Sequence, residues 1–316
     1  MSLTPLMLSA LATSAVPGLQ AVSAHGMSSA ERDGALINDV NGQAWMVELP
    51  TSEAEQIRFQ ARLDALRALG EGLRTRLPFQ VARVAGTTDV QGKTLAVTDY
   101  IPGHTPSAKH ITAEVAASIA RALAAIHELP SANVIEAHRP ALSSLDELRE
   151  AAHIVDRAAA TGLLPQSLLR RWEAACEDRG LWHFESSVIH GQMQISRFVL
   201  EGSQVVGVTG WRHFRVADPA RDIAWLTTPA SQAFATPVIT EYRSARPGVD
   251  RWFLQRARFW AELDVARWLL HGMDTRSESI TQDAAGMLQA LNDRVSGDLD
   301  AAITQPITKP ASAARS

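Results

Sequence analysis

Hydrophobic and polar positions alternate in short segments between residues 34 and 101, a pattern typical of β-strands with one buried face. The segments ALINDV and QAWMVEL flank Asn41 and Gly42 and predict a β-hairpin, because this pair accepts the positive φ angles of a two-residue turn. Two further strands are expected in FQVARVAGT and KTLAVTDYI. Between the two strand pairs, Ser52 and Glu55 form a capping box that opens a helix. That helix has one apolar face, made of Phe59, Leu63, Leu66 and Leu69.

Apolar residues at helical spacing dominate both ends of the chain. Near the N-terminus, apolar residues recur at helical spacing and Pro17-Gly18 ends the pattern; these residues are Leu8, Leu11, Ala12, Ala15 and Val16. This segment lacks the basic residues of a secretion signal, so we interpret it as an amphipathic helix docked on the domain. After about residue 111 the pattern becomes helical. Thr112 caps a helix, and in this part of the chain only residues 187–209 have a strand-like pattern. Further helices are predicted at 145–159, 165–178, 250–271 and 281–299.

These patterns divide the chain into a strand-rich N-terminal lobe at residues 1–102 and a helical C-terminal lobe at residues 112–304. The Pro- and Gly-containing segment between them, residues 103–111, is a predicted hinge. The tail at residues 305–316 is rich in Pro, Ala and Ser, and we expect it to be disordered. A small sheet-rich lobe, a hinge and a large helical lobe with one β-hairpin are the organisation of a kinase-like phosphotransferase.

The segment VIHGQMQISRFVLEGSQVVGVTGWRHFRVADPARDIAWL, residues 188–226, resembles the aminoglycoside phosphotransferase family, and the surrounding sequence is most similar to its macrolide-phosphotransferase branch. In that family the loop reads His-Gly-Asp, an Asn follows five residues later, and an Asp stands directly before a Trp after a hairpin. The resemblance implies an α+β, two-lobed protein-kinase-like fold with its catalytic loop at residues 188–211. The match has no gaps and retains His190, Gly191, Trp211, Asp218, Pro219, Ala220 and Asp222.

The residues that would carry the family's chemistry are replaced. Gln192 stands at the position of the catalytic Asp. Arg197 and Gly210 stand at the positions of the metal-binding Asn and Asp. On the strand AWMVELP, where the family carries a basic residue that holds nucleotide phosphates, the aligned residue is Glu48. The resemblance therefore implies a degenerate base position, two degenerate metal positions and a degenerate phosphate-binding position.

The chemistry of phosphate transfer explains why these replacements matter. A carboxylate orients the acceptor hydroxyl and takes its proton, and Mg²⁺ offsets the charge of the transferred phosphate. Gln192 donates and accepts hydrogen bonds but takes up no proton at neutral pH. Magnesium prefers oxygen ligands, whereas the Arg197 guanidinium repels it and Gly210 has no side chain. We therefore expect no bound metal.

The retained residues have structural interpretations. In this family the counterpart of His190 braces the loop backbone, and we expect the same here. Asp218 and Asp222 are expected to cap the following helix or to bind loop amides, with a substitute role as base or metal ligand as the alternative. For Arg197, two alternatives stay open: it is solvated or paired internally, or it takes the missing metal's place and meets a phosphate.

Composition narrows the possible partners and the compartment. The net charge is −4 and like charges form no run, which predicts neither a nucleic-acid nor a membrane partner. The single cysteine, Cys176, forms no internal disulfide, which suits a reducing cytoplasm. Its spacing from Trp172 predicts a buried helix position rather than a reactive thiol.

We therefore interpret the chain as a macrolide- or aminoglycoside-phosphotransferase-like pseudokinase that binds an unknown small molecule or protein. No cofactor is expected beyond weak, metal-independent nucleotide binding. The alternative is an active phosphotransferase that uses ATP or GTP and a macrolide- or aminoglycoside-type hydroxyl, or another transferase with a different site. Carboxylates converging near Gln192 from elsewhere in the chain would favour the enzyme.

Overall fold

The computed structural model of the chain describes residues 3–296 together with residues 303 and 304. Within this part of the chain, the residues pack as two compact units, each built from two separate stretches of sequence. The first unit comes from residues 1–139 and 190–215, and the second from residues 140–189 and 216–316.

This division does not test the predicted lobe boundaries, which stay predictions. The first unit covers the expected N-terminal lobe, residues 1–102, and adds the predicted hinge and the helices that follow it. Its second stretch, residues 190–215, brings most of the loop that resembles a catalytic loop into the same unit as the sheet. Glu48 and the replaced loop positions can therefore be compared within one compact unit. The predicted tail, residues 305–316, lies outside the described residues.

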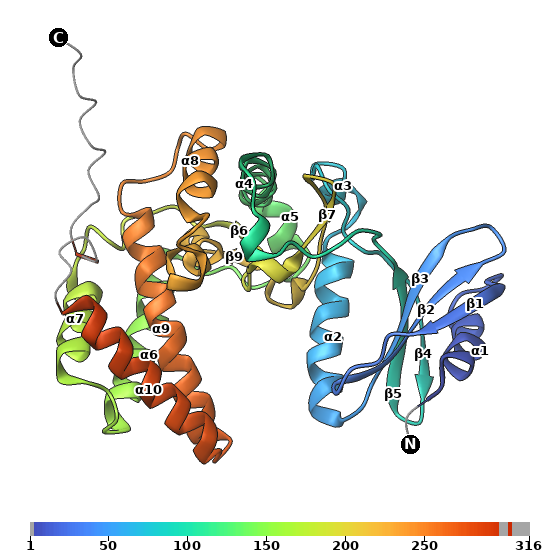
Figure 1. The fold of residues 1–316 in the computed structure, drawn as a ribbon, viewed down its shortest axis with the longest axis horizontal. Coiled ribbons are helices and arrows are strands. Elements are labelled where there is room, and N and C mark those ends of the chain that lie inside the picture. Colours follow the sequence, from blue (N-terminus) through green and yellow to red (C-terminus); the bar gives the residue numbers. More distant parts are fainter. Residues whose placement is uncertain (1–2, 297–302, 305–316) are drawn as a thin grey trace, which may run out of the picture. The chain divides into compact units, whose positions relative to one another are not determined.

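The predicted strands of the first unit are confirmed as one antiparallel sheet (Figure 1). Within residues 3–296, this sheet has five strands in the order β1-β2-β3-β5-β4, one more than the sequence pattern indicates. The additional strand, β1, pairs with β2 at the edge of the sheet and is largely exposed, so no buried alternation marks it. The strands are β1 (Ala21–Gly26), β2 (Arg32–Asp39), β3 (Ala44–Pro50), β4 (Val84–Val90) and β5 (Lys93–Asp99).

Two helices cover opposite faces of this sheet (Figure 1). The predicted N-terminal helix is confirmed as α1 (Pro5–Ala15), and α2 (Glu53–Ala68) starts at Ser52, whose Oγ accepts from the Glu55 N–H at 3.2 Å. Side chains alternate along a strand, so Val47 of β3 packs in the α1 core and Glu48 lies on the α2 side. The α1 core contains Leu8, Ala12, Ala15, Ala35, Ile37, Trp45, Val47, Leu49, Leu95 and Val97.

The turn between β2 and β3 differs from the expected two-residue turn. The Asp39 N–H donates to the Gln43 carbonyl at 2.9 Å, so three residues form the loop. Gly42 has a left-handed φ of 78°, whereas Asn41 does not have a positive φ. The Asp39 carboxylate accepts from the Asn41 N–H at 2.8 Å and from the Gln43 N–H at 2.9 Å. This side-chain bonding stabilises a longer loop with a single glycine-type residue, which the Asn-Gly signal alone does not predict.

The hairpin β7 (Phe198–Glu201) and β8 (Gln204–Val208) belongs to the first unit and confirms the strands expected at 187–209. Leu200 exchanges two backbone hydrogen bonds with His104, at 3.0 and 2.8 Å. On the other strand, Gln80 bonds to Val206 and Val208. The hairpin is therefore fixed to the segments before β4 and after β5. The remaining helices of this unit are α3 (Glu71–Arg74), α4 (Ala113–His127) and α5 (Ser131–Glu136), with short 3-10 turns at Ala108–His110, Ile195–Arg197 and Trp211–His213.

The second unit is mainly helical. The predicted helices after residue 140 are confirmed, except that residues 297–299 of the last one lie outside the described residues. Helix α9 packs against both α6 and α10 (Figure 1). A further helix, α8, lies in a stretch where the sequence pattern indicates none. The helices are α6 (Ser144–Ala160), α7 (Gln166–Glu177), α8 (Ala235–Ala245), α9 (Phe253–Asp274) and α10 (Glu278–Val295), with short strands β6 (Ser187–Ile189) and β9 (Arg215–Ala217).

Cys176 lies near the end of α7 and is half-buried. Burial, together with the nearby Asp156, Glu173 and Glu177, raises the pKa of its thiol to about 12. This supports the structural interpretation of the cysteine, because the thiolate is the reactive form. None of the described helices is long and apolar enough to cross a membrane.

Candidate functional site

Arg197 and Gly210, at which the sequence resemblance predicts replaced metal ligands, lie side by side at the base of the β7–β8 hairpin. The Thr209 N–H donates to the Arg197 carbonyl at 2.9 Å, which joins the two ends of the hairpin. Gly210 has a left-handed backbone with φ of 88°. A Cβ atom added to Gly210 would lie 2.7 Å from Cδ and 2.8 Å from Nε of Arg197. The arginine side chain therefore fills the space in which a side chain at position 210 would begin.

His190 braces this loop from within the core. Its buried ring hydrogen-bonds through Nε2 to the Thr209 carbonyl at 2.9 Å and through Nδ1 to the Gln192 N–H at 3.3 Å. Because a backbone N–H donates to Nδ1, the proton of the neutral ring lies on Nε2 and is donated to the carbonyl. The ring also packs edge-on against the buried Trp211, with 4.8 Å between centroids. His190 thus holds the backbone, while the residue at the base position, Gln192, is exposed.

Glu48 is bonded to two arginines. The Arg62 guanidinium on α2 forms an ion pair with its carboxylate through one terminal nitrogen and lies 3.4 Å from it through the other. The Arg32 Nε lies 2.9 Å from the same carboxylate. In protein kinases the corresponding strand carries a lysine that pairs with a glutamate on the following helix. Here the link between strand and helix persists with its charges exchanged.

Sequence comparison found Glu48 but missed Arg62. A signal for it was available, because Arg62 lies three residues after Phe59 and four before Leu66, on the apolar face of α2. The guanidinium lies 4.7 Å from the centroid of the Phe59 ring and has a buried Nε. A basic residue on the apolar face of this helix, together with an acidic residue on the strand, predicts an ion pair between Glu48 and Arg62.

The loop around Arg197 is rich in positive charge. Burial lowers the pKa of the Arg197 guanidinium, and the neighbouring Arg212 and Arg32 lower it further, with Glu31 acting in the opposite direction. Arg212 donates from Nε to His213 Nε2 at 3.0 Å. Burial and nearby cations lower the pKa of His213 to about 4, so this ring is neutral at pH 7. Within the described part of the chain, neither Arg197 nor Arg212 forms an ion pair with a carboxylate.

A cleft of about 300 Å³ lies within the first unit, and Gly210, which contacts Arg197, is one of the residues that line it. Glu48 and Arg62 line it from the sheet and α2, Tyr100 and His104 from the segment after β5, and Gly210 and Trp211 from the end of the hairpin. The structure therefore brings three sequence-predicted positions, Glu48, Gly210 and Trp211, to one cleft.

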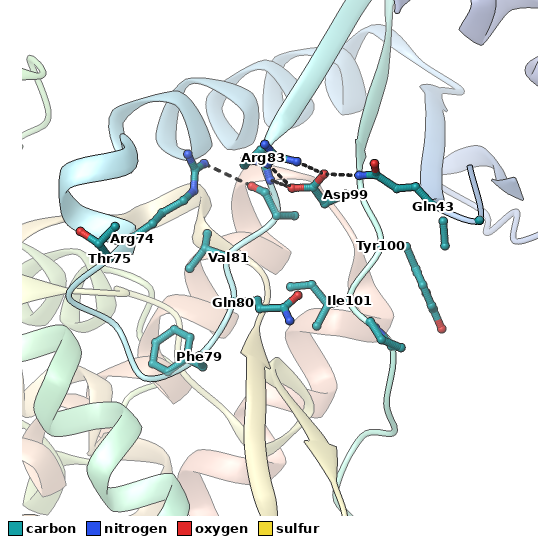
Figure 2. Close-up of a pocket in the computed structure, with 14 residues that line it drawn as sticks. Gln43, Arg74, Thr75, Phe79, Gln80, Val81, Arg83, Asp99, Tyr100 and Ile101 are labelled. Atoms are coloured by element: carbon teal, nitrogen blue, oxygen red, sulfur yellow. Dashed lines mark hydrogen bonds and ion pairs between the residues drawn. The ribbon is translucent and has the colours of Figure 1, made fainter. Parts of the chain in front are cut away.

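A second hollow, of about 680 Å³, shares Asp99, Tyr100 and Ile101 with the first (Figure 2). Figure 2 shows the Asp99 carboxylate between Arg83 and Gln43. Arg83 donates to it from Nε at 2.7 Å and from a terminal nitrogen at 3.1 Å, and this pairing raises the pKa of Arg83. The third charged residue of this hollow, Arg74, donates to the Leu66 carbonyl at 2.6 Å and to the Ala82 carbonyl at 3.3 Å. The sequence analysis did not identify this hollow.

Asp218 and Asp222 belong to the second unit and are fully buried. Asp218 Oδ1 accepts from the Ala220 N–H at 3.0 Å, which caps the 3-10 turn Pro219–Asp222. Its other oxygen accepts from Arg256 Nε at 2.9 Å and from Trp260 Nε1 at 2.8 Å. These bonds use both oxygens of Asp218 to hold the loop and α9, as expected for a structural carboxylate.

The residues of the cleft do not fit a magnesium ion. Of the two positions that would supply ligands, Gly210 offers no side-chain oxygen and Arg197 places a cation against it. The nearby carboxylate of Glu48 is already bonded to Arg32 and Arg62. Among the described residues, no group of three or more Asp, Glu, His and Cys side chains is arranged to hold a metal ion. No step of a metal-assisted reaction follows from these residues.

The fold and the loop agree with a family comparison. The profile of the phosphotransferase enzyme family matches residues 28–269, which is most of the chain. The chain belongs to this family of phosphotransferase-like proteins and has its two-lobed, kinase-like α+β fold. No curated protein matches the chain in a sequence search.

Solved structures of drug phosphotransferases share this fold. Macrolide 2′-phosphotransferase MphH from Brachybacterium faecium has a TM-score of 0.72 at 18% identity, covering 89% of this chain and 97% of its own. A type I macrolide 2′-phosphotransferase has a TM-score of 0.68 at 20% identity, with coverages of 91% and 98%. The GDP complex of aminoglycoside 2′-phosphotransferase-IIIa has a TM-score of 0.72 at 14% identity, with coverages of 92% and 99%. At these identities the similarity establishes the fold alone.

Proposed function

We propose that this chain is a pseudokinase, a member of the phosphotransferase enzyme family that binds a ligand in its cleft without transferring phosphate. The observation that carries the proposal is the position of the Arg197 side chain against Gly210. The arginine lies where a side chain at position 210 would begin, which supports the expectation that a positive charge has replaced the divalent cation of the family's chemistry.

The exposed Gln192 and the pairing of Glu48 support the same proposal. An amide takes up no proton at neutral pH, so Gln192 does not replace the carboxylate base. Glu48 carries a negative charge on the strand where the family is expected to hold phosphates with a cation. Its ion pairs with Arg32 on β2 and Arg62 on α2 connect the sheet to the helix. Loss of the base together with the metal ligands removes most of the mechanism, because these groups act as a unit.

The partner that we propose is a small molecule, since the cleft of about 300 Å³ is at the lower end of ligand-pocket sizes. We place the protein in a reducing cytoplasm, which rests on its single cysteine and is part of the proposal. An active macrolide- or aminoglycoside-type phosphotransferase remains the competing function, and the family membership is what favours it.

A thermal-shift experiment with ATP and GTP, each with and without Mg²⁺, tests the proposal. We expect Mg²⁺ to add nothing to any stabilisation by the nucleotide, because the cleft offers the ion no ligands. The same measurement on the Arg197→Asn, Gly210→Asp variant with Gln192→Asp is the matched comparison, in which a gain from Mg²⁺ is expected. A shift of several degrees that the native protein shows with the Mg²⁺ complex alone would contradict the proposal.

A further inference from the structure

Arg197 has no carboxylate ion-pair partner among the described residues, and it contacts Gly210, one of the residues that line the cleft. Arg197 Nε is buried and has no hydrogen-bond partner among the described residues. A buried N–H of a guanidinium that bonds to no acceptor costs free energy, and an anion or another acceptor at that atom would compensate it. Arg197 is thus a half-buried cation with one buried donor that the described part of the chain does not satisfy.

The charged residues around Arg197 also favour the binding of an anion. Arg212 is close enough to act on the charge of Arg197, and it too forms no ion pair within the described residues. Its Nε donates to the neutral His213, which leaves the terminal nitrogens as further donors. Glu48 is bonded to Arg32 and Arg62, so its negative charge is offset before any ligand enters. Arg197 and Arg212 are therefore two neighbouring guanidinium groups, and Glu31 is the acid that acts on Arg197 in the opposite direction without forming an ion pair with it among the described residues.

We propose that Arg197, with Arg212, binds a phosphate group of a small-molecule ligand directly, in place of a divalent cation. Arg197 contacts Gly210, and Gly210 lines the cleft, so the remainder of the ligand would occupy the space beside Glu48 and Trp211. A guanidinium presents a planar set of donors that matches two phosphate oxygens, which makes arginine suited to this role. The inference rests on the proposed function, because an arginine in this place and a metal ion exclude each other.

This site differs from a metal-dependent phosphate site in its response to Mg²⁺. Arg197 and a magnesium ion would compete for the same phosphate oxygens, so chelation of the ligand by Mg²⁺ should weaken binding. In a metal-dependent site the ion strengthens binding. The direction of the Mg²⁺ effect therefore separates the two arrangements.

Isothermal titration calorimetry with pyrophosphate, in buffer that contains EDTA, tests the site on the full chain. We expect the native protein to bind pyrophosphate without metal and the Arg197→Ala variant to bind at least about tenfold more weakly, a difference of about 1.4 kcal/mol. Arg121→Ala is the matched control, because Arg121 is exposed and bonds to Gln204 at the opposite end of the same hairpin. It removes the same charge and should leave the affinity within about twofold.

Two further arms complete the experiment. Arg197→Lys keeps the positive charge and should retain part of the affinity, which separates loss of charge from misfolding of the Arg197→Ala variant. ADP in place of pyrophosphate shows whether a nucleoside adds affinity through the cleft, and the dependence on Arg197 should hold for both probes.

The inference is overturned if the native protein binds neither pyrophosphate nor ADP in EDTA. It is also overturned if Arg197→Ala and Arg121→Ala weaken the binding of pyrophosphate equally. Binding of pyrophosphate only in the presence of Mg²⁺ would overturn both this inference and the proposed function. If pyrophosphate binds without metal and Arg197→Ala does not weaken its binding, the inference about Arg197 is wrong and the proposed function still stands.

Discussion

The Glu48 carboxylate on β3 and the Arg62 guanidinium on α2 form an ion pair whose polarity is the reverse of the lysine–glutamate pair in protein kinases. The side chains are largely buried, with 13% exposure for Glu48 and 21% for Arg62. The pair keeps the mechanical connection between strand and helix and removes the cation from the strand.

The polarity of this pair can be tested by exchanging its charges. Glu48→Lys alone would place a lysine between Arg32 and Arg62, and we expect it to lower the free energy of unfolding by about 1–3 kcal/mol. Adding Arg62→Glu should recover most of that loss, because the ion pair forms again in the opposite sense. Chemical denaturation of the two single variants and the double variant gives the coupling energy.

The exposed pair of Asp64 and Arg67 is the control for this exchange. Both side chains are about half exposed, so the same charge reversals there should change stability by less than about 1 kcal/mol. Independent, additive effects of the changes at Glu48 and Arg62 would show that the pair contributes no specific interaction.

The contact of Arg197 with Gly210 predicts a dependence between these two positions. Gly210→Ala should cost about 1–2 kcal/mol for the left-handed backbone and an additional amount for the clash with Arg197. On an Arg197→Ala background, the clash is absent and only the backbone cost should remain. Equilibrium unfolding of the four proteins measures the difference.

Gly202 provides a matched control in the turn of the same hairpin. It has φ of 56°, and a Cβ atom added there meets nothing within 4 Å. Gly202→Ala should therefore lose the same stability whether residue 197 is Arg or Ala. If Gly210→Ala is equally insensitive to Arg197, the arginine does not occupy the space of a residue-210 side chain.

His213 predicts how stability depends on pH. Burial and the surrounding cations lower its pKa from 6.5 to about 4. The unfolded chain therefore binds a proton at this residue between these values while the folded chain does not, and stability falls as the pH drops from about 6.5 to about 4. His213→Asn should flatten the pH dependence of the unfolding free energy in this window.

His153→Asn removes an imidazole from an exposed position of α6 and is the matched control for the substitution itself. A variant at His213 that retains the full native slope between these pH values would show that its ring is not held neutral by the fold.

Most of the fold could be predicted from periodicity, because buried faces impose it. Helix α2 follows its apolar face and the Ser52 cap, and α4 follows Thr112, whose side chain accepts from the Val115 N–H. Strand β1 could not be predicted in this way, since an exposed edge strand has no buried face to mark it. The loop after β2 was wrong because the Asp39 side chain, rather than the Asn-Gly pair, determines its length.

For the candidate site, the sequence indicated which positions to examine but not which side chains contact one another. Motif spacing in the loop singled out Gln192, Arg197 and Gly210, and the strand AWMVELP singled out Glu48; their assignment to the family's reactive positions stays a prediction. Motif spacing could not show that Arg197 packs against Gly210, because that contact depends on a side-chain conformation at the base of a hairpin. The partner of Glu48 was missed for the same reason, although the position of Arg62 on the apolar face of α2 gave a signal.

The central claim is that this member of the family transfers no phosphate, and a direct transfer assay tests it. Native protein would be incubated with labelled ATP or GTP, Mg²⁺ and a panel of macrolides and aminoglycosides, with an active macrolide phosphotransferase as the positive control. We predict no phosphorylated product above the level without protein, for the native chain and for Gln192→Ala alike. A product formed by the native chain and abolished in Gln192→Ala would contradict the account.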